Sequence, residues 1–219
     1  MRNDVTCLYY TSNFEKEVFE KKIKDKLLAV CGDIPIVSIS QKPIDFGTNI
    51  CVGEVGACDH NLFRQIQIGC RAITTPYVIS CEADCLYPPD YFQFVPNNDN
   101  YYRFTPLYIL EAWGKDDYGG FFLKTTAPFA QITKREYWLS ELDRELKNTP
   151  QWLPNGDKYH LSLFLNKDWK EIALKNPIIS LKTGDGMRKH TQVSMTNMVN
   201  NLPYFGKAED LRKELWNDY

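Results

Sequence analysis

Two acidic residues, Glu82 and Asp84, follow a strand-forming run at positions 77–81. In an extended chain, side chains two positions apart point to the same face, so this spacing brings the two carboxylates together. Mg²⁺ and Mn²⁺ take a few carboxylate oxygens as ligands and complete their shells with phosphate and water oxygens. The pair therefore predicts a divalent cation site that binds a phosphate-bearing ligand. The alternative is a pair of solvated charges at a strand end.

The flanking segments place this pair at a defined point of a fold. A helix is expected over residues 59–73, where Asp59 is a candidate N-cap and apolar residues recur at helical spacing. A buried strand is expected over 77–79, and Pro88 and Pro89 end the extended run before a short helix that starts near Tyr91. The acidic pair thus falls at the carboxyl end of a buried strand, where open α/β sheets bind ligands.

The first part of the chain alternates strand and helix. Strands are expected over 4–12 and 34–40, a helix over 14–30, and a glycine-bearing loop over 43–58. This order predicts the α/β class, with a mainly parallel, Rossmann-type sheet and helices on both of its faces.

The second part has a different pattern, with longer strand-like runs and fewer helices. The expected elements are strands over 97–110 and 119–132, a helix over 134–147, a short helix after Asn155, a strand and loop over 178–186, and a terminal helix over 208–217. We expect one domain over 1–219, with a ligand-binding half over about 1–96 and a second half over about 97–219.

Composition excludes several classes of protein. The 219 residues are 43% hydrophobic and 25% charged, which is typical of a globular enzyme domain and not of a disordered chain. A net charge of −2 provides no global field for nucleic acids or anionic membranes. No apolar run approaches the roughly 20 residues that span a bilayer, and no secretory leader is visible, so we expect a cytoplasmic protein. The seven scattered cysteines indicate reduced thiols.

A second concentration of chemistry lies at residues 182–192. Two glycines permit a tight loop there, and Lys182, Arg188, Lys189 and His190 bring positive or coordinating groups together. Such a loop is suited to bind a diphosphate. The alternative is an ordinary solvated basic loop.

The stretch from Asn61 to Phe92 resembles the nucleotide-sugar half of GT-A glycosyltransferases, with Glu82-Ala83-Asp84 as a family-2-like variant of the Asp-x-Asp motif. The resemblance implies a GT-A-like fold and a Mn²⁺- or Mg²⁺-dependent transfer of a sugar from a nucleotide-diphosphate donor to a hydroxyl acceptor. This chain departs from the family in two places. Glu replaces the first Asp, and Gln41-Lys42-Pro43 replaces the acidic turn that many members use near the base.

The same resemblance implies roles for residues around the nucleotide. Tyr9, Thr11 and Ser12, at the end of the first strand, correspond to the turn that contacts the nucleotide. Arg64 corresponds to a helix residue that faces the base or phosphate. The alternatives are sheet tyrosines with exposed hydroxyls and an exposed helix arginine.

Two further residues take roles from the family. His190 corresponds by position to the histidine that completes the metal shell or contacts the diphosphate. Asp157, in the Asn155-Gly156-Asp157 turn, corresponds to the general base of inverting members, although Asp at a helix start is also an ordinary N-cap. A retaining enzyme needs no such base.

Other functions remain open from the sequence. One alternative is a nucleotidyltransferase that makes a nucleotide sugar, but such enzymes open with a glycine-rich, basic loop after the first strand, and residues 11–17 contain no glycine. Another is a non-catalytic module that binds a nucleotide sugar. The acceptor cannot be read from the sequence, which is compatible with a saccharide, a protein or a hydroxylated DNA base.

Overall fold

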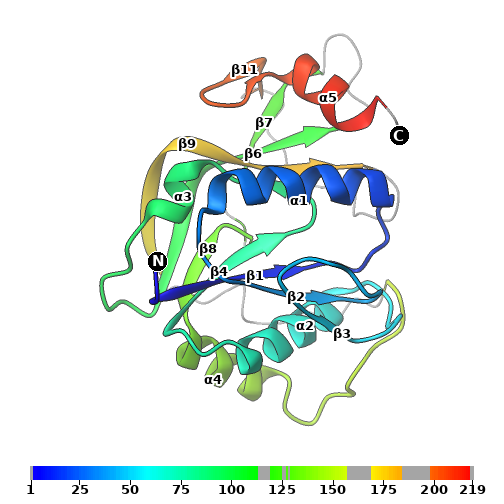
Figure 1. Cartoon of the computed structure of the whole chain (residues 1–219), viewed down its shortest axis with the longest axis vertical. Coiled ribbons are helices and arrows are strands. Elements are labelled where there is room, and N and C mark those ends of the chain that lie inside the picture. The colour runs from blue at the N-terminus through cyan, green and yellow to red at the C-terminus, as the bar shows by residue number, and fades with distance from the viewer. Residues whose placement is uncertain are drawn as a thin grey trace.

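The computed structural model describes residues 2–112, 119–124, 127, 129–156, 169–183 and 198–217. Strands β1 to β10 form one mixed sheet with helices on both faces, so the expected α/β class is confirmed (Figure 1). Within the described residues, no helix has the length and apolar character that a bilayer span requires.

The parallel part of the sheet comes from the first third of the chain. Its strands run in the spatial order β3-β2-β1-β4, with every neighbouring pair parallel. Their bounds are β1 (Val5–Tyr10), β2 (Ile36–Ser40), β3 (Thr48–Cys51) and β4 (Tyr77–Glu82). Strand β3 lies in the segment expected to be a loop. It was missed because this short edge strand is half-exposed or exposed along its whole length and so shows no buried pattern.

Helices α1 (Glu17–Cys31) and α3 (Pro89–Gln93) cover one face of this part, and α2 (Asp59–Ala72) and α4 (Arg135–Glu145) cover the other (Figure 1). The alternation of side chains along β1 separates the two cores. Cys7 and Tyr9 pack into the core with residues of α1 and α3, whereas Leu8 and Tyr10 pack into the core with residues of α2 and α4. Gly69 in α2 is required for close packing, because a Cβ there would collide with the Leu8 side chain.

The remaining strands of the sheet pair mainly antiparallel. They are β5 (Cys85–Leu86), β6 (Tyr101–Glu111), β7 (Phe121–Lys124), β8 (Gln131–Lys134), β9 (Lys170–Lys182) and β10 (Met198–Val199). Strand β8 joins the two parts, because it pairs antiparallel with both β4 and β6. Strand β9 pairs parallel with β6 and antiparallel with β5.

Two expectations for this region were wrong in their bounds. The single strand expected over 119–132 is two strands, β7 and β8, which pair with different parts of β6. The last long strand starts at Lys170 and not near residue 178, because the first part of β9 alternates exposed residues with half-buried ones such as Ile172 and Leu174 and lacks a continuous apolar run.

The terminal helix α5 (Ala208–Trp216) follows a small sheet of β11 (Asn201–Leu202) and β12 (Gly206–Lys207). Leu211 and Leu215 of α5 belong to a third core, together with Phe19 and Ile23 of α1 and residues of β6 and β9. The expected terminal amphipathic helix is thus confirmed, and in Figure 1 it lies above the sheet beside β6 and β7.

Candidate functional site

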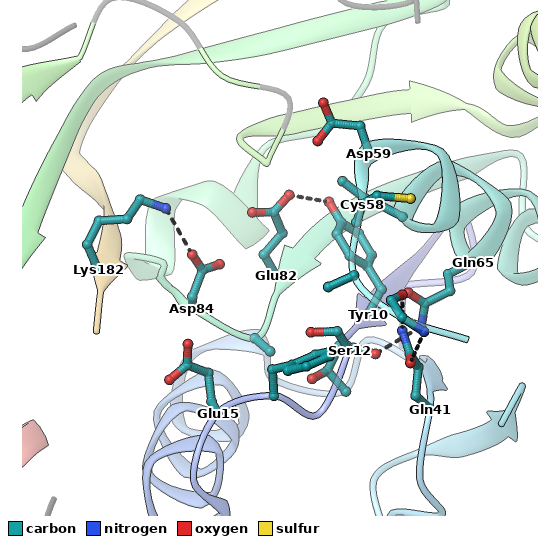
Figure 2. A pocket seen from close by; sticks show the side chains of 16 residues that line it. Tyr10, Ser12, Glu15, Gln41, Cys58, Asp59, Gln65, Glu82, Asp84 and Lys182 are labelled. Atoms are coloured by element: carbon teal, nitrogen blue, oxygen red, sulfur yellow. Dashed lines mark hydrogen bonds and ion pairs between the residues drawn. The ribbon is translucent and has the colours of Figure 1, made fainter. Parts of the chain in front are cut away.

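A cavity of about 280 Å³ opens at the carboxyl ends of β1 and β4, beside the start of α2 (Figure 2). Polar and charged side chains form much of its wall. The lining residues are Tyr10, Thr11, Ser12, Phe14, Glu15, Gln41, Gly56, Ala57, Cys58, Asp59, Leu62, Gln65, Glu82, Ala83, Asp84 and Lys182. This is the edge of a parallel sheet at which α/β proteins bind ligands.

The acidic pair lies on the wall of this cavity. Glu82 is the last residue of β4, and Asp84 lies in the tight turn that leads to β5, so the chain is not extended through both residues as expected. Ligand atoms of Glu82, Asp84 and Cys85 nevertheless all lie within 4.8 Å of one another. Burial, and next the charge of Asp84, raises the pKa of Glu82 to about 8. Two close carboxylates in such surroundings fit a divalent cation, which would offset their mutual repulsion.

Two tyrosines hold Glu82 in position. The Tyr10 hydroxyl donates a hydrogen bond to Glu82 Oε1 at 3.1 Å (Figure 2). The backbone N–H of Glu82 donates to the Tyr87 hydroxyl at 2.9 Å, and this hydroxyl donates to the backbone oxygen of Phe129 at 3.2 Å. The carboxylate is therefore oriented before any ligand binds.

Cys85 supports the other carboxylate. Its thiol lies 3.6 Å from Asp84 Oδ1, to which it donates a weak hydrogen bond. Burial, and then the charges of Asp84 and Glu82, raises the pKa of the Cys85 thiol well above its usual range. Since Mg²⁺ and Mn²⁺ prefer oxygen ligands, the fit to such an ion rests on the two carboxylates, with the thiol behind them.

Lys182, the last residue of β9, reaches the same point from the other part of the sheet. Its ammonium lies 3.3 Å from Asp84 Oδ2 (Figure 2). Burial lowers the pKa of Lys182, but the nearby Asp84, Cys85 and Glu82 outweigh this effect, and the net pKa is raised. A positive charge thus borders the cavity, and the phosphate-binding role of this lysine stays a prediction.

Of the three residues predicted at the end of the first strand, two line the cavity. Thr11 and Ser12 line the cavity. The Thr11 hydroxyl donates to Glu20 at 2.7 Å, and its backbone oxygen accepts from the Gln65 side chain at 2.9 Å. Tyr9 is fully buried on the opposite face of β1, so its neighbour Tyr10 lines the cavity instead.

The far wall of the cavity is fixed by amides that the sequence did not single out. The Gln41 side chain accepts hydrogen bonds from the backbone N–H groups of Val55 and Gly56 and donates to the Gly56 oxygen. Asn61 donates to the backbone oxygens of Val55 and Leu153. The only sequence signal was the position of Gln41 directly after the second strand, where the family has an acidic turn.

Arg64 does not line the cavity. Its guanidinium donates to the backbone oxygens of Leu146, Thr149 and Pro150, and to the Thr149 hydroxyl at 2.9 Å. These bonds fix the chain that follows α4 against α2. The expected nucleotide contact is thus replaced by a structural role, because the helix presents this residue to α4 and not to the ligand edge.

Four predicted site residues, Asp157, Arg188, Lys189 and His190, lie outside the described residues. The described residues that precede them in sequence form hydrogen bonds with residues that line the cavity. Before Asp157, the Asn155 side chain accepts from the N–H of Ala57 at 3.1 Å, and Gly156 N–H donates to the Ala57 oxygen at 2.9 Å. Before the basic loop, Thr183 donates to Glu15 at 2.7 Å.

One charged residue near the carboxylates was missed. Lys124 ends β7, and its ammonium interacts electrostatically with Lys182, Cys85, Glu82 and Asp84. The sequence carried no signal for it, because the run around it gave one expected strand without a functional motif. Only the pairing of β7 with β6 brings it toward the site.

Together these residues define an α/β protein with a ligand cavity at the carboxyl edge of its parallel strands and a candidate metal centre on the cavity wall. No protein-family model matches the sequence. No curated protein matches it either.

Solved structures show a distant likeness, and two of them illustrate it. The bifunctional IspDF from Campylobacter jejuni aligns with a TM-score of 0.46 and 11% identity over 79% of this chain, which spans 50% of the length of that protein. The inositol-1-phosphate CTP transferase from T. maritima aligns with a TM-score of 0.43 and 8% identity, over 85% of this chain and 92% of that one. These TM-scores are too low to assign an activity.

Proposed function

We propose that this protein is a metal-dependent glycosyltransferase of the GT-A type, which moves a sugar from a nucleotide-diphosphate donor to a hydroxyl acceptor. The observation that carries the proposal is the group of Glu82, Asp84 and Lys182 on one wall of the cavity. A divalent cation and an ammonium side by side are suited to bind a diphosphate at this wall.

Each part of the site has a role in this proposal. Glu82 and Asp84 would hold Mn²⁺ or Mg²⁺, which when bound stabilises the negative charge of the departing nucleoside diphosphate. Tyr10 holds the Glu82 carboxylate and Tyr87 holds the Glu82 backbone before the donor arrives, so little reorganisation is needed. Lys182 adds a fixed positive charge next to the pair.

The nucleoside would occupy the other end of the cavity. There the turn at Thr11 and Ser12 faces the segment 56–58, whose conformation Gln41 and Asn61 fix through hydrogen bonds. Phe14 lines this cavity and is 46% exposed, so its ring is available to pack against a ligand.

The proposal extends to residues outside the described part of the chain. Arg188, Lys189 and His190 would approach the diphosphate from the loop after Thr183, with His190 next to the metal. Asp157 would deprotonate the acceptor hydroxyl. Both assignments are supported by the attachment of the preceding residues to the cavity, through Thr183 to Glu15 and through Gly156 to Ala57.

Nucleotidyl transfer is the competing chemistry. The name of the distantly similar inositol-1-phosphate CTP transferase refers to a reaction of this class. The described cavity wall favours glycosyl transfer. It has the carboxylates of Glu15, Asp59, Glu82 and Asp84 but, among the described lining residues, Lys182 as its single basic side chain. A nucleoside triphosphate carries more negative charge than a nucleotide sugar and would meet more repulsion there.

A product assay separates these functions. The protein would be incubated with Mn²⁺ and either a panel of nucleotide sugars or a panel of nucleoside triphosphates with sugar 1-phosphates. We expect release of nucleoside diphosphate from one nucleotide sugar, and its loss on adding EDTA or in Glu82→Gln. Asp210→Asn, which removes a carboxylate of α5 outside the cavity, is the matched control and should remain active.

Other outcomes of the assay would replace the proposal. Pyrophosphate release from a triphosphate would show nucleotidyl transfer. Metal-dependent binding of a nucleotide sugar without release of any product, over a range of saccharide, protein and hydroxymethylated DNA acceptors, would show a binding module.

A further inference from the structure

The ammonium of Lys124 is half-buried at the end of β7. It lies 5.4 Å from the centre of the Phe129 ring, whose backbone oxygen accepts the hydrogen bond from Tyr87. Tyr87 in turn binds the backbone N–H of Glu82. This series of contacts connects Lys124, on the antiparallel strand β7, to the backbone of Glu82.

Lys124 lacks a full counter-charge in the part of the chain that the structure describes. There, no carboxylate lies within ion-pair or hydrogen-bond distance of its ammonium, whereas Lys182 takes the 3.3 Å contact with Asp84. Burial lowers the pKa of Lys124, and the charge of Lys182 lowers it further against the opposing effect of Cys85, Glu82 and Asp84. A half-buried ammonium without a charged partner is unfavourable, and groups with perturbed pKa values cluster at functional sites.

The charges at this point indicate which ligand is missing. Glu82 and Asp84 balance Lys124 and Lys182, so the four side chains together are neutral when all are ionised. A divalent cation on the carboxylates leaves the group with an excess of two positive charges. The diphosphate of a nucleotide sugar carries roughly two negative charges and would restore neutrality.

We propose that Lys124 and Lys182 together form a subsite for the phosphoryl oxygens farther from the nucleoside, with Lys124 binding from the side of β7. This inference rests on the proposed function for the identity of the ligand, but the subsite itself requires only a diphosphate and a metal. Lys182 lines the cavity and Lys124 does not. Lys124 would therefore meet only the phosphoryl group farther from the nucleoside, and it should contribute to the binding of a diphosphate and not of a monophosphate.

Binding of inorganic pyrophosphate, and of matched nucleoside mono- and diphosphates, tests the subsite. Each would be titrated calorimetrically with Mn²⁺ into the full chain and its variants. Lys124→Met should weaken the binding of pyrophosphate and nucleoside diphosphate about 10- to 100-fold, as expected for the loss of a charge-assisted contact, and leave the monophosphate unchanged. Lys124→Arg should recover part of the affinity. Without ligand, Lys124→Met should unfold at the same temperature as the parent or at a higher one, because the unpaired charge is removed.

Lys134→Met is the matched control. Lys134 also ends a strand, but it pairs with Tyr77 at the start of β4, the opposite edge of the sheet from the carboxylates. This variant should bind every probe as the parent does. An equal loss in both variants would contradict a specific role for Lys124.

The remaining outcomes keep the two proposals apart. Unchanged diphosphate and pyrophosphate binding in Lys124→Met would overturn the subsite while leaving the nucleotide-sugar function intact. Pyrophosphate binding that depends on Lys124, with no binding of any nucleoside diphosphate, would support the subsite and overturn the proposed function. A parent protein that binds none of these probes would overturn both.

Discussion

The parallel and antiparallel parts of the sheet contribute to the site in opposite ways. The parallel part, whose strands are four to six residues long, supplies the cavity edge and the Glu82 carboxylate, and the turn that follows β4 supplies Asp84. The antiparallel part supplies the positive charges, Lys182 from β9 and Lys124 from β7. The candidate metal centre thus lies at the junction of two parts with complementary charge.

Contacts between the two parts occur at the acidic pair itself. Strand β5, which follows Asp84 directly, pairs with β9, and the N–H of Leu181 donates to the backbone oxygen of Asp84 at 2.7 Å. The neighbouring Lys182 then meets the Asp84 carboxylate, and these two side chains are only 14% and 10% exposed. One part of the sheet thus forms the cavity edge, while the other supplies the positive charge that lies beside the carboxylates.

The largest expected effect separates binding from turnover. If Asp157 is the general base, Asp157→Asn should lower the rate of sugar transfer about 10²- to 10⁴-fold and leave donor affinity near normal. Single-turnover rates and donor titrations would measure the two quantities independently. Full turnover in this variant would contradict the role of Asp157 and indicate another base or a retaining mechanism.

The next largest effect tests the candidate metal centre at the junction of the parallel and antiparallel parts. Asp84→Asn should weaken Mn²⁺-dependent binding of a nucleoside diphosphate by about 100-fold or more. Loss of a residue that hydrogen-bonds a metal-binding side chain typically costs about 10- to 100-fold in metal affinity, and loss of the metal-binding carboxylate itself should cost at least as much. Thermal shift with and without Mn²⁺ gives the readout, and unfolding without ligand shows whether the fold is kept.

Asp99 provides a matched control for Asp84. It pairs with Lys170, the first residue of β9, at 3.2 Å, but the two side chains are 46% and 55% exposed. Asp99→Asn should therefore change neither binding nor stability measurably. Equal ligand stabilisation in Asp84→Asn and Asp99→Asn would remove Asp84 from the metal site.

The smallest expected effect concerns the contact between α2 and the chain that follows α4, which lies outside the cavity. Arg64→Met removes the hydrogen bonds from α2 to the chain after α4 and should lower the free energy of unfolding by about 1–3 kcal/mol. Donor binding should stay within experimental error of the parent, as measured by the same calorimetric titration. A selective loss of nucleotide affinity with unchanged stability would restore the binding role expected from the sequence.

The sequence by itself determined most of the parallel half. Helix α2 and strand β4 lie close to their expected bounds because their apolar residues follow helical and extended periods without interruption. The acidic pair was found because its two carboxylates lie two positions apart in one segment. For α4, the predicted apolar residues Trp138, Leu142 and Leu146 are all buried.

Tertiary structure decided the rest, and the reason is the distance along the chain between interacting residues. Lys182 reaches Asp84 across 98 positions of sequence, and Lys124 comes within electrostatic influence of the carboxylates only because β7 pairs with β6. Local periodicity contains no information on which strands pair. Local periodicity also left undecided whether Tyr9 or Tyr10 lines the cavity. A strand points neighbouring side chains to opposite faces of the sheet, and the cavity lies on only one face.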